Sequence, residues 1–132
     1  MKYLLDTHTL IWAITENKKL SSVVKKVLED STNTILVSSI TFWEISLKFS
    51  LGKLNLEGIN PEDFPSLVSE MKFDTISLDV KGAATYHYLK TVHHKDPFDR
   101  MLIWQAIQNN LILISNDENM PFYRSEGLKL LW

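Results

Sequence analysis

Cysteine is absent from the 132 residues of this chain. Its absence excludes a disulfide framework and any zinc site built on thiolates. Oxygen and imidazole remain as possible metal ligands, and oxygen ligands favour magnesium or manganese. A chain without disulfides is also compatible with a reducing compartment, and we expect a cytoplasmic protein.

Long apolar runs are absent too. No stretch approaches the roughly 20 apolar residues that a membrane span requires. The first residues also lack the basic start, the apolar stretch and the small-residue cleavage site of a signal peptide. These absences predict a protein with no membrane partner.

The chain has no excess of positive charge. Its formal net charge is −2 at pH 7, whereas a phosphate backbone attracts a basic surface. Any contact with nucleic acid must therefore use a local patch. The candidates are Lys18 and Lys19, Lys25 and Lys26, and the run from His93 to Lys95 with Arg100. For each lysine pair, a solvated helix face or turn is the simpler explanation.

Repeats, low-complexity segments and linkers are also absent. Hydrophobic residues make up 45% of the sequence, which is enough for one substantial core in a chain of this length. We therefore expect residues 1–132 to form a single globular domain.

Strand-like and helix-like periods alternate along the chain. Strand patterns cover residues 3–5, 34–37, 75–78 and 111–114, and an edge strand is expected at 128–131. Helical patterns cover 10–14, 22–28, 40–51, 61–71 and 97–109, and a further helix begins after Asp79. Strands separated by helices imply right-handed crossovers. We predict an α/β fold of three layers, with a central, mainly parallel sheet of four to five strands flanked by helices.

Two of the predicted strands run into aspartate. Asp6 follows the first strand directly, and Asp117 follows the fourth after Ser115 and Asn116. The carboxyl ends of parallel strands form a shared crevice, so acids placed there come together although they are far apart in sequence. Carboxylates gathered in one crevice repel each other unless they are protonated or bridged by a cation. This placement predicts a divalent-metal site.

Each of these acids also has a plain structural explanation. Asp6 can cap the following helix, although Thr7 could fill that role instead, and Asp117 can belong to a turn or a short helix start. Asp79 has the same position after a strand, but the residues behind it favour a simple cap.

Two more acids open a helix in the segment Asp96-Pro97-Phe98-Asp99. Asp99 lies at the start of the apolar stripe that continues through Leu102 and Ile103, so it is expected to point inward. For Asp96 we favour an N-cap. For Asp99, capping and metal binding are compatible, because the positive end of a helix helps to keep a carboxylate ionised.

Glu44 lies in a helix that is apolar nearly all round. A charge there is costly unless it is paired or binds a metal. The alternative is an ordinary pair with Lys48, four residues on, and the sequence alone does not decide between the two. The histidines offer no further ligand pair, because none has the helical spacing of a zinc site.

The order of these features carries more information than any one of them. The most specific segment is HKDPFDRMLIWQA at residues 94–106. It is supported by LLDTHTLIW at 4–12, by VSSITFWEISLK at 37–48 with GKL at 52–54, and by LISNDENM at 113–120. Together they make the chain resemble the PIN-domain family, specifically the toxin ribonucleases of VapBC type. The resemblance covers essentially the whole chain.

The resemblance implies a PIN fold that binds Mg²⁺ or Mn²⁺ and cleaves RNA as the toxin of a type II toxin-antitoxin system. The residues that match the family's acids are Asp6, Glu44, Asp99 and Asp117, with Asp96 as a frequent companion and Thr7 and Ser38 as supporting hydroxyls. Arg100 is a candidate for contacting RNA phosphate, with a helix-surface ion pair as the simpler alternative. The implied partners are a VapB-like antitoxin and a second copy of the chain. One departure is Ser115, where the family more commonly has threonine.

As a hypothesis, Asp6 and Asp99 hold the principal ion, while Glu44 and Asp117 complete its shell, bind a second ion or orient water. Metal-activated water would then attack the phosphodiester in line. One alternative is a catalytically inactive PIN-like module that binds RNA or protein. Another is a haloacid-dehalogenase-like phosphatase, but such enzymes require an aspartate where this chain has His8.

Overall fold

The computed structural model describes residues 1–91 and 93–132 of the chain. Its centre is a five-stranded sheet in the order β3-β2-β1-β4-β5, in which every neighbouring pair is parallel. The strands are β1 (Lys2–Leu5), β2 (Thr34–Ser38), β3 (Asp74–Ile76), β4 (Ile112–Ile114) and β5 (Lys129–Leu131). The predicted α/β fold with a parallel central sheet is confirmed.

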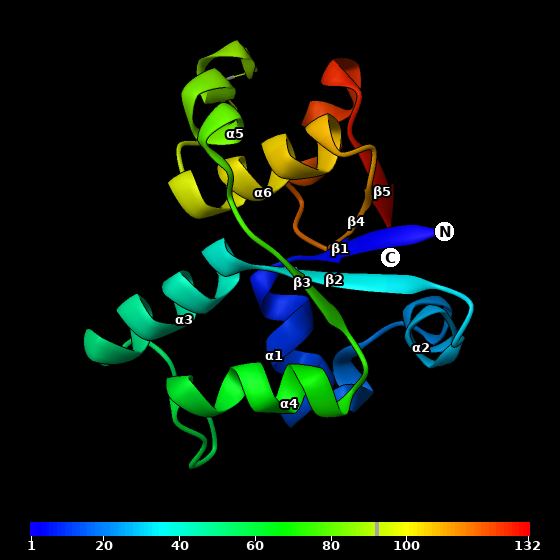
Figure 1. The fold of residues 1–132 in the computed structure, drawn as a ribbon, viewed down its shortest axis with the longest axis vertical. Helices are drawn as coiled ribbons and strands as arrows, with labels where there is room; N and C mark the ends of the chain where they lie inside the picture. The colour runs from blue at the N-terminus through cyan, green and yellow to red at the C-terminus, as the bar shows by residue number, and fades with distance from the viewer. Residues whose placement is uncertain (92) are drawn as a thin grey trace.

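Helices cover both faces of the sheet (Figure 1). On one side lie α1 (Thr7–Thr15), α2 (Ser22–Glu29) and α4 (Phe64–Glu70), and on the other lie α5 (Val80–Thr85) and α6 (Pro97–Gln108). The helix α3 (Ser39–Ser50) leads away from the end of β2. Short 3₁₀ helices are η1 (Asn17–Lys19), η2 (Pro61–Asp63), η3 (Tyr86–Tyr88) and η4 (Met120–Glu126). Within the described ranges, no helix has the length and apolar character to cross a membrane.

The sheet separates two apolar cores, and β1 contributes to both. Tyr3 and Leu5 belong to the core that includes Leu10 of α1, whereas Leu4 belongs to the core that includes Leu102 of α6. Successive side chains of a strand point to opposite faces. A continuous apolar strand is therefore buried on both sides, as is typical of parallel sheets.

The strand order creates a switch point between β1 and β4. From β1 the chain adds β2 and β3 on one side, then returns to the other side with β4 and β5. In open α/β sheets, ligands bind at the carboxyl ends of strands beside such a point. Asp6 follows β1 and Asp117 comes shortly after β4, so the fold places both acids at this edge.

The third strand ends earlier than the predicted 75–78. It covers Asp74–Ile76, and the Leu78 amide instead donates a hydrogen bond to Ser39 Oγ at the start of α3. This interaction carries the chain away from the sheet. Asp79 then caps α5 by accepting a hydrogen bond from the Gly82 amide at 2.6 Å, as predicted.

Candidate metal centre

Asp6 lies buried at the switch point of the sheet. Its Oδ1 accepts a hydrogen bond from the Thr9 amide at 2.8 Å, so it caps α1. Burial raises the pKa of Asp6, while hydrogen bonds from Ser115 and Thr9 act in the opposite direction. The predicted cap is therefore present. The Asp6 carboxylate that forms it is costly to ionise, because it is buried.

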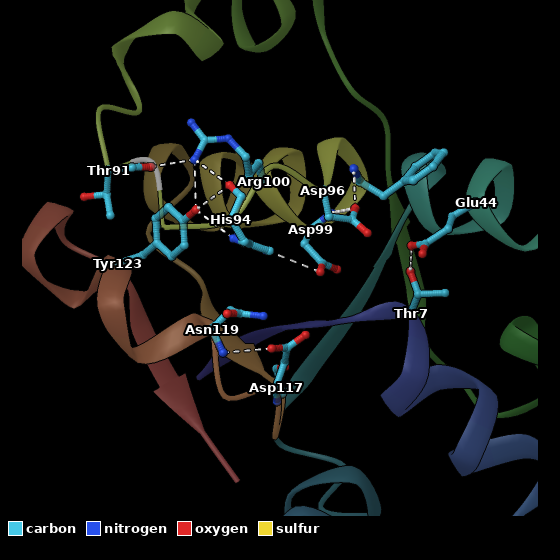
Figure 2. Close-up of polar contacts among 12 residues, drawn as sticks. Thr7, Glu44, Thr91, His94, Asp96, Asp99, Arg100, Asp117, Asn119 and Tyr123 are labelled. Carbon is cyan, nitrogen blue, oxygen red and sulfur yellow. Dashed lines mark hydrogen bonds and ion pairs between the residues drawn. The ribbon is translucent and has the colours of Figure 1, made fainter.

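Glu44 is 2% exposed on α3, although it carries a carboxylate. Its Oε1 accepts a hydrogen bond from Thr7 Oγ1 at 2.6 Å (Figure 2). Its Oε2 forms an ion pair with Lys48 one helical turn away. Burial alone would lower the pKa of Lys48, but the hydrogen bond and charge of Glu44 raise it overall. The pair with Lys48 is therefore present, but its carboxylate is buried rather than on the surface, and metal binding by Glu44 stays a prediction.

Asp96 caps α6. Its Oδ1 accepts hydrogen bonds from the amides of Phe98 at 2.9 Å and Asp99 at 3.0 Å, with Pro97 in the first helical turn. This confirms the predicted cap. It also fixes the first turn of α6 and so determines where the Asp99 side chain begins.

Asp99 lies among several carboxylates, and the space that these acids surround is called the pocket below. Burial and neighbouring charge together raise its pKa from 3.8 to about 8. After burial, the contributing carboxylates in decreasing order are Asp96, Glu44, Asp117 and Asp6. All the acids singled out from the sequence are thus close enough to act on one side chain. The fold brings them together from the ends of β1 and β4, from α3 and from the start of α6.

Asp117 faces this pocket from the opposite side. Figure 2 shows its carboxylate pointing toward the space below Asp99. The Asp117 amide donates to Ser115 Oγ at 3.1 Å, and Asp117 Oδ1 accepts from the Asn119 amide at 2.8 Å. The predicted turn is therefore present. Ser115 supplies its hydrogen bond although threonine is commoner at this position in the family that the sequence resembles.

His94 also borders the pocket, although the sequence singled it out only as part of a basic run and not as a neighbour of the acids. Its Nε2 lies 3.5 Å from Asp99 Oδ2, and its Nδ1 lies 2.9 Å from the hydroxyl of Tyr123. Burial lowers the pKa of His94, although the charges of Asp117 and Asp96 oppose this effect. A search for paired histidines misses it, because its partners are an acid five residues on and a tyrosine from η4.

Arg100 does not lie where the RNA-contact hypothesis requires it. The residue is 7% exposed, and its guanidinium donates to the hydroxyls of Tyr86 at 2.7 Å and Tyr123 at 2.8 Å. It also donates to the carbonyl oxygens of Thr91 and Leu89. Both the predicted phosphate contact and the surface ion pair are therefore wrong. Arg100 joins the segment before α6 to η4 inside the protein.

The two supporting hydroxyls have different roles. Thr7 touches an acid directly through its hydrogen bond to Glu44. Ser38 instead accepts from the Ile40 amide at 3.1 Å, which caps α3, and donates to Gln105 Oε1 of α6 at 2.5 Å. Ser38 therefore fixes the two helices that carry Glu44 and Asp99.

The match to a family covers almost the whole chain. A model of the PIN domain matches residues 3–127. This chain belongs to the PIN domain family. No curated protein matches it.

Solved structures show the same fold from end to end. VapBC2 from Rickettsia felis, bound to a DNA fragment from its promoter, gives a TM-score of 0.69 at 22% identity, covering 99% of this chain and 98% of that one. DNA-bound VapBC from Salmonella typhimurium gives a TM-score of 0.68 at 20% identity, and the match covers 99% of this chain and 97% of that one. VapBC-1 from nontypeable Haemophilus influenzae gives a TM-score of 0.69 at 20% identity, and the match again covers 99% of this chain and 97% of that one. At these identities the likeness establishes a shared fold.

The donor atoms of this PIN domain fit a hard divalent cation. They are carboxylate oxygens, which suit magnesium and manganese. Burial, and after it the charge of neighbouring carboxylates, raises the pKa of Asp99, so a compensating positive charge would favour the ionised form of this acid. Among the residues that the structure describes, however, no three histidine or acidic side chains are close enough to hold an ion directly. Magnesium keeps several of its waters, so a site of this kind uses some carboxylates through water.

Proposed function

We propose that this PIN domain is a Mg²⁺- or Mn²⁺-dependent endoribonuclease and the toxin of a type II toxin-antitoxin pair. One observation supports the proposal most strongly: burial, and after it the charges of four neighbouring carboxylates, raise the pKa of Asp99 to about 8. Acids held together at such a cost are characteristic of functional sites rather than of structural ones. The family match adds that the pocket lies in a PIN domain, and it removes the phosphatase alternative.

In this proposal Asp6 and Asp99 hold the principal ion, while Glu44 and Asp117 act through water or hold a second one. When bound, the ion supplies a nucleophilic water of lowered pKa and neutralises charge on the phosphate. Thr7 keeps the Glu44 carboxylate oriented, and the Asp96 cap fixes the base of Asp99.

The test is cleavage of total cellular RNA by the purified chain with and without Mg²⁺ or Mn²⁺. We expect the Asp6→Asn and Asp99→Asn variants to fold and to lose at least about 100-fold in metal-dependent cleavage, because each removes a charged ligand. Asp79→Asn is the matched control, since Asp79 is a strand-end aspartate that only caps α5. Mapping the cleaved ends identifies the RNA target.

The same assay tests the alternative of an inactive binding module. Such a module would bind RNA or protein without cleaving it, and its acids would be dispensable. Full cleavage by a folded Asp6→Asn protein would defeat the nuclease assignment. RNA binding without cleavage by the unmodified chain would favour the module.

We also propose that a VapB-like antitoxin covers this site. An apolar groove with a volume of about 200 Å³ runs between α3 and α6, and its lining includes Ile40, Trp43, Phe98 and Met101. Trp43 is 60% exposed and its ring packs edge-on against Phe98, with 5.0 Å between centroids. Trp43 precedes Glu44, and Phe98 precedes Asp99. A segment lying in the groove in a helix-in-groove mode would therefore obstruct the acids.

A second copy of the chain is the other proposed partner. Leu47 of α3 and Leu51, which caps the C-terminal end of that helix, continue the exposed apolar surface from Trp43, with 37% and 58% of their surfaces exposed. A contiguous apolar stripe of this kind is typical of protein interaction sites.

A further inference from the structure

A chain of hydrogen bonds runs from the buried guanidinium of Arg100 to the pocket (Figure 2). Arg100 Nη1 lies 2.8 Å from the Tyr123 hydroxyl, which lies 2.9 Å from His94 Nδ1. On the other side of the same ring, His94 Nε2 lies 3.5 Å from Asp99 Oδ2. Four side chains from α6, η4 and the segment before α6 are thus joined in one line.

The distances along this line favour one arrangement of the hydrogens. A guanidinium only donates, so the Tyr123 oxygen accepts from Arg100. The hydroxyl hydrogen of Tyr123 then goes to His94 Nδ1, because the other acceptor nearby, the His94 carbonyl oxygen, is farther away at 3.5 Å. A neutral imidazole has one N–H group, so a ring whose Nδ1 accepts must carry its hydrogen on Nε2.

No other described side chain or backbone group engages the Nε2 atom. It is buried and makes no hydrogen bond within normal distance, yet Asp99 Oδ2 is the atom in front of it. An N–H group there donates toward the carboxylate, and its nitrogen has no free lone pair with which to bind a metal. His94 therefore acts on the ligand and does not serve as one.

We propose that Arg100, Tyr123 and His94 form a relay that holds His94 as the Nε2–H tautomer and thereby positions the Asp99 carboxylate. Arg100 is the rigid end of this relay, because Tyr86 and the carbonyl oxygens of Thr91 and Leu89 fix the rest of its guanidinium. The inference rests on the proposed function only in that the positioned carboxylate is a metal ligand. Partners that orient a ligating carboxylate typically change metal affinity about 10- to 100-fold when they are removed.

The first test is the tautomer of His94 in the whole, metal-free protein at a pH above about 8, where the Asp99 carboxyl is ionised and can only accept. Long-range ¹H–¹⁵N spectra of histidine-labelled protein distinguish a protonated Nε2 from a protonated Nδ1, and the His94→Gln spectrum identifies the signal among the four histidines. We expect a protonated Nε2, and a shift toward the Nδ1–H form in Tyr123→Phe. A protonated Nδ1 in the unmodified protein overturns the relay.

Tyr86→Phe is the matched control for Tyr123→Phe. It also removes a tyrosine hydroxyl that accepts from Arg100, but that hydroxyl does not touch His94. The relay predicts an unchanged His94 tautomer in this variant. An equal change in both variants would mean that the tautomer follows a general loosening around Arg100, and the relay would be wrong.

The second test compares two replacements of His94. Isothermal titration calorimetry measures the affinity of each variant for Mn²⁺. A glutamine amide nitrogen reaches the place of Nε2 and can still donate to Asp99, whereas asparagine reaches only the place of Nδ1. We expect His94→Asn to weaken Mn²⁺ binding about 10- to 100-fold and His94→Gln to retain most of it. Equal affinity in the two variants contradicts the positioning role.

These tests separate the inference from the proposed function. If the unmodified protein binds no Mn²⁺ while His94 has a protonated Nε2 that depends on Tyr123, the metal proposal fails and the relay stands. If Mn²⁺ binds but the tautomer is the other one, the relay fails alone. Tyr123 is fully buried, so its variant is checked by thermal unfolding, and the His94 pair decides the matter if that variant does not fold.

Discussion

Among the single residues, Asp99 shows how burial beside other carboxylates affects the free energy of unfolding. Its carboxyl has an ordinary pKa of 3.8 in the unfolded chain and one of about 8 in the folded, metal-free protein. The folded state therefore holds a proton on Asp99 at pH values where the unfolded state does not. By linkage, this difference makes the free energy of unfolding depend on pH.

The metal-free protein should lose stability as the pH rises from 6.5 to 8. Between pH 3.8 and about 8, the folded state binds more protons at Asp99 than the unfolded state, so the stability falls as the pH rises and levels off above the folded pKa. The window begins at 6.5 because His94 titrates below it. Melting temperatures in the presence of a chelator measure the slope, and Asp99→Asn should flatten it. A slope that survives in Asp99→Asn would assign the effect to other groups.

Thr7 offers a second prediction at the residue scale. Thr7→Val keeps the shape of the side chain but removes the donor to the buried Glu44 carboxylate, so it should cost about 1.5–3 kcal/mol in the free energy of unfolding. Thr32→Val is the control, because Thr32 donates to the carboxylate of Asp30 on the exposed surface. Urea unfolding measures both. Equal losses in the two variants would show that the buried hydrogen bond from Thr7 to Glu44 contributes no more to stability than the exposed one from Thr32.

Sequence reasoning succeeded for residues whose roles depend on local order. Asp96 caps α6 because a cap, a proline and an acid follow one another, and this pattern is complete within four residues. It failed for Arg100, because the acceptors of its guanidinium come from Tyr86 and Tyr123 in segments that only the tertiary fold brings near. His94 was missed for the same reason.

Among the elements, the helix α3 has two faces with clearly different environments. One side buries Glu44 and Ile45, while Trp43, Leu47 and Leu51 form an exposed apolar stripe. The sequence predicted a helix here but could not divide its residues into faces, because it is apolar nearly all round. The predicted end of the third strand was wrong for a related reason, since a hydrogen bond from Leu78 to Ser39 at the start of α3 ends the strand early.

If the stripe on α3 joins two copies, the purified chain should be a dimer by light scattering. Leu47→Glu combined with Leu51→Glu should produce a monomer that keeps its fold, because a buried unpaired charge opposes association. Val80→Glu on α5 is the control, since Val80 is 86% exposed and lies on another element. A monomeric unmodified chain contradicts this prediction. A dimer that the α3 variant leaves intact would place the interface elsewhere.

Across the whole molecule, the pocket depends on the parallel sheet. Asp6 and Asp117 come from opposite halves of the chain and meet because β1 and β4 are neighbours, while α3 and α6 bring Glu44 and Asp99 to the same place. The alternation of strands and helices was enough to predict this convergence. It could not predict the separations among the carboxylates, because these depend on side-chain packing at α3 and α6.

Because the ligands converge only in the folded chain, metal binding should stabilise the whole protein. At free Mn²⁺ 100-fold above its dissociation constant, the free energy of unfolding should rise by about 2.7 kcal/mol, provided that the unfolded chain does not bind the ion. The rise should be visible as a higher melting temperature at pH 8 and should reverse with a chelator. Asp99→Asn should show little of it, whereas Asp79→Asn should behave like the unmodified chain, because Asp79 only caps α5. If Mn²⁺ stabilised the unmodified chain and Asp99→Asn equally, the ion would bind outside the pocket.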